Sequence, residues 1–207
     1  MLLFEYTTER LRSRLYEICA DLMSEPPALE LLVQIRQSLA ILPEFPGTLH
    51  AVEWLCHAID LTCANGRELD MVGREFRAWL EPLASLRIRT PYASEHCTPA
   101  EWSQLHDADC PHEPGKRCPF GNSYCVNRIG APCDHIGAAL RIMSWLYRDA
   151  ANATESEWEI AKSRCRRFAR RHLKGWVGKV ALAMSERTCT QLYVAAFTLL
   201  EDLSGSE

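Results

Sequence analysis

The sequence contains no apolar run long enough to cross a membrane. No stretch approaches the roughly 20 uninterrupted apolar residues that a spanning helix needs. The opening Met1-Leu2-Leu3-Phe4 is followed at once by Glu5, so it also lacks the long apolar centre of a secretory signal. From these absences we expect a cytoplasmic protein without stable membrane insertion.

Strand-like patterns are missing as well. The chain has almost no alternation of β-branched and polar residues, no internal repeat and no low-complexity segment. Its 207 residues are 47% hydrophobic and 24% charged, which is ordinary for a globular protein and enough for one well-buried domain. We therefore predict an all-α fold, a single domain over residues 1–207 built as a bundle of about eight or nine helices.

An excess of basic residues is absent too. The chain has 23 Lys and Arg against 27 Asp and Glu, a net charge of −4. A dedicated nucleic-acid-binding protein is normally basic overall, so we expect no nucleic-acid partner. One basic run, residues 162–179, contains no acidic residue. We interpret it mainly as a solvated helix face, with contact to a protein client or to a phosphate-bearing cofactor as alternatives.

Helix signals, by contrast, recur along the chain. They consist of capping residues, prolines at first helical positions and apolar residues three and four positions apart. These signals predict helices over residues 6–22, from Pro27, from Thr48, from about Glu68, from Thr98, from Thr154, past Gly175 and from Thr188.

The most apolar helix is expected after Pro132. The proline disfavours a helical residue at 133, and Asp134 is a good N-cap, so the helix should begin there with His135 in its first turn. The run Ala138 to Trp145 makes it apolar on most sides, which is typical of a helix in the middle of a bundle. Three of its side chains are expected to face water: Arg141, Ser144 and Arg148.

Ten cysteines form two groups. Five lie in helical patterns, where a free thiol acts as a small buried hydrophobe: Cys19, Cys56, Cys63, Cys165 and Cys189. The others lie between 97 and 133, mostly in an irregular segment over 107–133. Since nothing signals export, we expect no disulfide framework.

The spacing of the loop cysteines bears on metal binding. Cys110, Cys118, Cys125 and Cys133 are separated by 7, 6 and 7 residues, whereas zinc and iron–sulfur sites favour C-x-x-C pairs. We predict reduced thiols, no metal and no cofactor. A metal-binding or redox-sensing module using these cysteines is the alternative function.

Three segments carry a resemblance to a known family. Residues 131–137, Ala-Pro-Cys-Asp-His-Ile-Gly, resemble the E-P-x-D-H-I/L signature of the TorD/DmsD/NarJ family of molybdoenzyme maturation chaperones. Residues 171–176 resemble its H-L-x-x-W element, and residues 91–94, which follow Phe76 to Trp79, resemble its P-Y-E-S element. Ala131 stands where the family has glutamate, and the cysteine-rich loop replaces a helix.

The resemblance implies a cytoplasmic chaperone that is not an enzyme. Such a chaperone binds the twin-arginine signal peptide, the apo form, or both, of the catalytic subunit of a molybdopterin-dependent oxidoreductase until the cofactor is inserted. A receptor for guanidinium groups and an apolar stretch needs a carboxylate beside a hydrophobic groove. The implied binding residues are Pro132, Asp134, His135, Trp79, Tyr92, Ser94 and Trp145.

Other interpretations of the same residues stay open. Asp134 can be an N-cap worth about 1 kcal/mol and nothing more. Cys133, Asp134 and His135 contain the groups of a cysteine hydrolase, but neighbouring side chains at a helix start point in different directions, so we expect no catalysis. A homodimer formed by exchange of helices is also left open.

Overall fold

A computed structural model describes residues 2–42, 48–80, 136–173, 178–180 and 190–205. Helices make up the secondary structure of these residues, and no strand occurs among them, so the predicted all-α class is confirmed. The predicted total of eight or nine helices stays a prediction, because long segments lie outside these ranges. The helices are α1 (Leu2–Ser24), α2 (Leu29–Ala40), α3 (Leu49–Ala64), α4 (Gly66–Glu75), η1 (a π-helix, Phe76–Leu80), α8 (Ile136–Asn152), α9 (Glu155–Phe168), η2 (a π-helix, Ala169–Leu173) and α11 (Gln191–Gly205).

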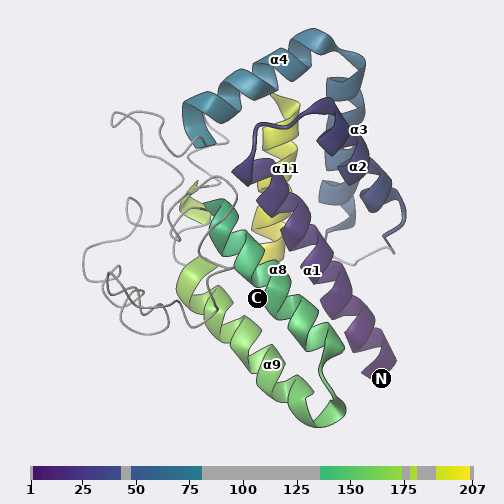
Figure 1. The fold of residues 1–207 in the computed structure, drawn as a ribbon, viewed down its shortest axis with the longest axis vertical. Coiled ribbons are helices and arrows are strands. Elements are labelled where there is room, and N and C mark those ends of the chain that lie inside the picture. Colours follow the sequence, from purple (N-terminus) through teal and green to yellow (C-terminus); the bar gives the residue numbers. More distant parts are fainter. Residues whose placement is uncertain (1, 43–47, 81–135, 174–177, 181–189, 206–207) are drawn as a thin grey trace, which may run out of the picture.

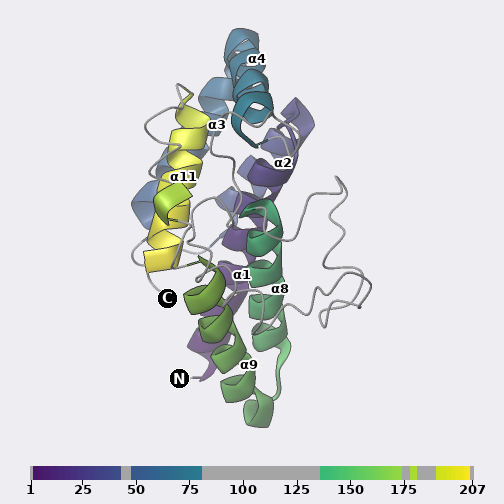
Figure 2. The same ribbon diagram turned by 90° about the vertical axis from the view of Figure 1, so that its left-hand side faces the viewer.

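Helix α1 forms the middle of the bundle (Figures 1 and 2). It runs antiparallel to α8, and these two helices share the most extensive interface between described elements. Helix α9 packs on α8, α11 packs on α3 and α1, and α2 packs on α3. Helix α4 crosses one end of the bundle. Neighbours in space are therefore often distant in sequence.

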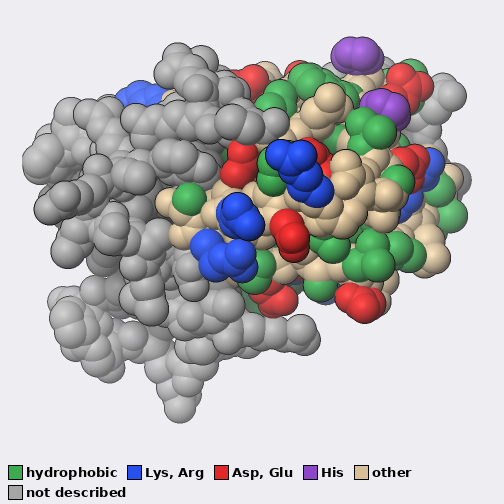
Figure 3. All heavy atoms as spheres, turned by 90° about the horizontal axis from the view of Figure 1, so that it is seen from above, with side chains coloured by type: hydrophobic (Ala, Val, Ile, Leu, Met, Phe, Trp, Pro, Cys, Tyr) green, Lys and Arg blue, Asp and Glu red, His purple; other side chains and the backbone are tan. Residues whose placement is uncertain are grey.

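The face of the described part seen in Figure 3 carries both charged and apolar side chains. Viewed along the long axis (Figure 3), hydrophobic side chains reach the surface of the described part between acidic and basic ones. None of the described helices combines the length and the apolar character needed to cross a membrane.

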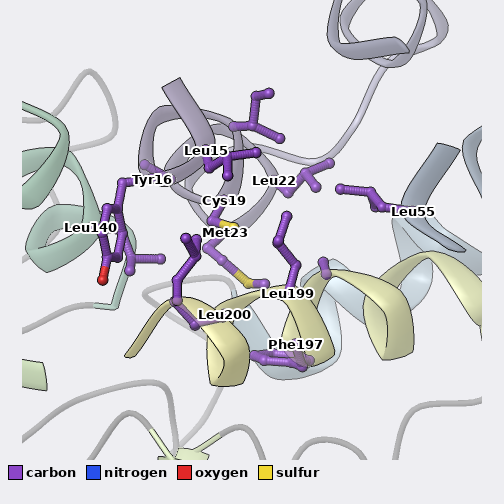
Figure 4. Packing of buried hydrophobic residues seen from close by; sticks show 14 of the residues in the cluster. Leu15, Tyr16, Cys19, Leu22, Met23, Leu55, Leu140, Phe197, Leu199 and Leu200 are labelled. Carbon is purple, nitrogen blue, oxygen red and sulfur yellow. The ribbon is translucent and has the colours of Figure 1, made fainter. Parts of the chain in front are cut away.

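The core lies on both sides of α1 (Figure 4). Its Cys19 and Met23 meet Leu199 and Leu200 of α11, whereas Tyr16 lies toward α8. All five side chains are fully buried or nearly so. At about 25 cal/mol per Å² of apolar surface removed from water, this two-sided burial is the main stabilising contribution.

The beginnings of α2 and α4 differ from the prediction. Pro27 was expected to open α2, but the helix begins at Leu29, after the extended residue Ala28. Helix α4 was expected from about Glu68 and begins at Gly66, because the side-chain oxygen of Asn65 accepts the Arg67 N–H at 3.0 Å. Asn65 thus ends one helix and caps the next.

The capping box predicted for α9 is confirmed. The Thr154 backbone N–H donates to Glu157 Oε2 at 3.2 Å, and the Thr154 hydroxyl lies 2.6 Å from the same oxygen. These hydrogen bonds to the charged form lower the pKa of the Glu157 carboxyl. Thr48 stands at the start of α3 as expected, yet its hydroxyl makes no capping hydrogen bond. The cap predicted at Thr188 lies outside the described residues.

Helix α8 is buried as its sequence predicts, with one correction. Ile136, Leu140 and Met143 are 0% exposed, and most of the 17 residues of the helix are buried. Arg148 is exposed and Arg141 is partly exposed, as expected. Ser144 was expected to face water and is instead 0% exposed, because α1 approaches α8 at this position.

Candidate functional site

Nearly all residues of the predicted signal-peptide site lie outside the described part of the chain. These residues are Tyr92, Ser94, Pro132, Asp134 and His135. Trp79 belongs to η1, but its side chain is not among those described. Trp145 lies on α8 and is half-buried. The predicted site therefore stays a prediction. The structure describes the interface between α1 and α8, the helix that follows Asp134 and His135 in the sequence.

The interface between α1 and α8 has a polar centre. The Ser13 hydroxyl donates to the Ser144 carbonyl oxygen at 2.8 Å, inside the interface. One turn further along α8, the Tyr147 hydroxyl accepts a hydrogen bond from Arg12 Nη1 at 2.9 Å. The Tyr147 ring also stacks on Tyr16, with centroids 5.8 Å apart. Such contacts are directional, so they fix how α8 is placed along α1.

Two ion pairs flank this centre. Arg141 Nη2 lies 2.6 Å from Asp21 Oδ1, and Arg148 Nη2 lies 3.4 Å from Glu17 Oε1. The Arg141 and Asp21 side chains are 29% and 28% exposed, so water weakens the attraction. These ion pairs help to fix the position of α8 along α1 and contribute little to the free energy of unfolding. Helix α8, which follows the D-H pair directly in the chain, is thus firmly held.

A groove of about 420 Å³ opens between α1, α2 and α3. Its volume lies within the range of ligand-binding pockets. Apolar side chains make up half of its lining: Leu11, Leu15, Leu39, Leu42, Leu49 and Val52. The sequence analysis did not identify this groove as a site.

Charged groups stand along one side of the groove, on α2 and α3. Arg36 Nε donates to both carboxylate oxygens of Asp60, at 3.0 and 3.2 Å. Glu53 also lines the groove, is exposed, and forms no hydrogen bond or ion pair with another described residue. The groove therefore combines an apolar lining with the Glu53 carboxylate and the exposed His57 imidazole.

A cysteine in the groove is unsuited to catalysis. Burial raises the pKa of the Cys56 thiol, although nearby Arg36 acts in the opposite direction. The thiol is thus protonated at neutral pH, and a protonated thiol is a poor nucleophile.

Only part of this groove could be predicted from the sequence, namely the spacing of its residues on α3. Positions 53, 57 and 60, which hold Glu, His and Asp, follow helical spacing, so a polar stripe along α3 could be identified. Cys56 and Cys63 were assigned as buried hydrophobes, and both are half-buried; Cys19 and Cys165 are buried as predicted. All four are free thiols. Three helices must be packed together before an opening exists, and local spacing does not provide that information.

A second feature that the sequence analysis missed joins α4 to α11. The Glu75 carboxylate accepts the Thr190 backbone N–H at 3.2 Å and also the Thr190 hydroxyl. A carboxylate from one helix thereby caps the N-terminus of another. Burial and the nearby Glu75 charge raise the pKa of the Tyr193 hydroxyl, which keeps this phenol neutral. The Glu75 carboxylate thus links α4 to the start of α11.

No group of three or more His, Cys, Asp or Glu side chains could hold a metal ion within the described residues. The loop cysteines lie outside them, so their predicted lack of a metal stays a prediction. Most of the described part of the basic run lies on α9 and η2. Its Arg164, Arg167 and Arg170 side chains are exposed, in agreement with a solvated face.

Comparison of the chain with known protein families, with curated proteins and with solved structures gave no match. The likeness to the TorD/DmsD/NarJ family thus depends on the sequence motifs alone.

Proposed function

We propose that this protein is a cytoplasmic chaperone of the TorD/DmsD/NarJ type. It binds the twin-arginine signal peptide, the apo form, or both, of a molybdopterin-dependent oxidoreductase and holds this client until its cofactor is inserted. The observation that carries the proposal is the D-H-I element, residues 134–136, whose isoleucine is the first residue of the buried helix α8 in an all-α protein. The H-L-x-x-W element around His172 gives independent support.

A carboxylate suits the recognition of guanidinium groups. Charge-assisted hydrogen bonds between arginine and carboxylate are among the stronger polar contacts in proteins. In the sequence Asp134 stands two residues before Ile136, the first residue of a helix whose position is fixed by the Ser13 and Tyr147 contacts. A fixed helix next to a binding carboxylate favours binding, because ordering a mobile segment would reduce affinity.

Calorimetry with synthetic signal peptides tests the proposal. The probe carries the Arg-Arg pair and an apolar stretch of about 12 residues, and the control peptide carries Lys-Lys instead. We expect binding of the Arg-Arg peptide and at least tenfold weaker binding by Asp134→Asn, since a charge-assisted hydrogen bond is worth about 1.5–3 kcal/mol. The matched control is Asp149→Asn, at an exposed aspartate of α8. Failure of the unaltered protein to bind any twin-arginine peptide would refute the proposed function.

A further inference from the structure

The groove between α1, α2 and α3 is a surface that the proposed function does not yet use. It contains none of the residues predicted for the signal-peptide site. We infer that it binds the apolar stretch of the client's signal peptide, with Glu53 contacting a basic side chain of that peptide. The inference depends on the proposed function and adds a second contact for the same ligand.

The length of the groove suits such a segment. Its lining on α3 extends from Leu49 to Asp60, twelve residues whose eleven rises of about 1.5 Å span about 16 Å. The apolar stretch of an export signal has about 7–15 residues, and ten of them in a helix are about 15 Å long. Leu11 and Leu15 of α1, 5% and 0% exposed, form part of the apolar lining.

Exposed apolar side chains are concentrated on α2 and α3, and one of them, Leu49, lines the groove. Six large hydrophobic residues of the described part are exposed, and five belong to α2, to its C-terminal end or to α3. The five residues are Leu29, Val33, Ile41, Leu49 and Leu61. Single exposed apolar residues are ordinary, but a concentration on two adjacent helices is typical of an interaction surface.

The charge of the groove determines which peptide it accepts. Besides His57, the charged lining groups on this side are the Arg36–Asp60 pair, which is neutral as a unit, and the Glu53 carboxylate, so the charge of these acidic and basic groups sums to negative. An apolar segment flanked by arginine or lysine complements this surface, whereas an acidic segment would be repelled. The exposed arginines of α9 have the wrong sign for the same peptide. Charge and apolar surface together select a cationic, apolar partner.

Two matched substitutions on α3 test the inference by calorimetry with the same Arg-Arg peptide. Leu49 and Leu61 are 41% and 42% exposed, but only Leu49 lines the groove. We expect Leu49→Gln to weaken binding about fivefold and Leu61→Gln to leave it unchanged. Glu53→Gln should weaken binding to the Arg-Arg peptide by a similar factor. Equal affinities of the unaltered protein, Leu49→Gln and Glu53→Gln would overturn the inference while leaving the proposed function in place.

Thiol protection gives a second readout inside the folded protein. Cys56 lines the groove, and Cys63 lies two turns further along α3 and does not. Both thiols are half-buried and have raised pKa values, so mildly alkaline buffer is needed for alkylation. The peptide should slow iodoacetamide labelling of Cys56 several-fold and leave Cys63 unchanged, as measured by peptide mass spectrometry. Protection that rises with protein concentration in the absence of peptide would overturn the inference, because a second copy of the chain would then cover the groove.

Discussion

Replacement of Ser144 by leucine tests the α1–α8 interface most directly. Ser144 is 0% exposed, and its carbonyl oxygen accepts the Ser13 hydroxyl at 2.8 Å, so the two helices are close at this point. A leucine adds methyl and methylene groups where no space is available, which typically costs about 1–3 kcal/mol. In a chain of this length each kcal/mol lowers Tm by about 3 °C, so we expect a Tm lower by roughly 3–9 °C.

Smaller changes at the same contact separate packing from hydrogen bonding. Ser13→Ala removes the donor and should cost about 1 kcal/mol. Ser144→Ala should cost less than about 0.5 kcal/mol, because the Ser13 bond is made to the backbone oxygen of Ser144 and survives. The side-chain contact that is lost is long, 3.5 Å between the two hydroxyl oxygens.

Thermal and urea unfolding followed by circular dichroism measure these differences. The matched control is Asp149→Leu, since Asp149 is exposed on the same helix and such substitutions usually change stability by less than about 0.5 kcal/mol. Equal stability of Ser144→Leu and Asp149→Leu would refute the reasoning. It would mean that Ser144 faces water, as the pattern of the sequence alone predicts.

Three further predictions concern caps and a thiol. Thr154→Ala should raise the pKa of Glu157, seen by NMR titration; since that pKa is lowered in the folded state, the contribution to stability exists at higher pH and is lost as pH falls through the lowered value. An unchanged titration would contradict the capping box. Thr190→Val should cost about 1–2 kcal/mol in urea unfolding, and Glu75→Gln less, because the amide still accepts the Thr190 N–H. Burial and Asp21 raise the pKa of Cys19 to about 12, so at pH 8 iodoacetamide should modify it only after unfolding, as mass spectrometry would show.

The all-α class could be predicted from the sequence because its signals are local. Apolar spacing and the Thr154–Glu157 pair each lie within one or two helical turns, so no knowledge of distant residues is needed. The start of α2 was misplaced for a related reason. Pro27 is a favourable first helical residue, but the helix begins two residues later, at Leu29, and the pattern does not distinguish these starts.

Features that depend on two or more helices could not be predicted in this way. A serine among apolar residues reads as solvent-facing, and only the approach of α1 makes Ser144 a buried residue. The groove and the cap that Glu75 provides to α11 have the same origin, since each requires partners from separate helices. The signal-peptide residues around Asp134 were proposed from a motif, and the described part of the chain neither supports nor contradicts them.

The pairing of α1 with α8 has a consequence for biosynthesis. Ser13 and Ser144 are 131 positions apart, so α1 leaves the ribosome long before the surface that covers it has been made. At translation rates of 5–20 residues per second, this delay is about 7–26 s. During that time the apolar side of α1 is exposed and prone to aggregation. Temporary contacts with α2 and α3, or binding by other proteins, have to cover it. A protein proposed to bind incompletely folded clients is thus itself incompletely folded during part of its synthesis.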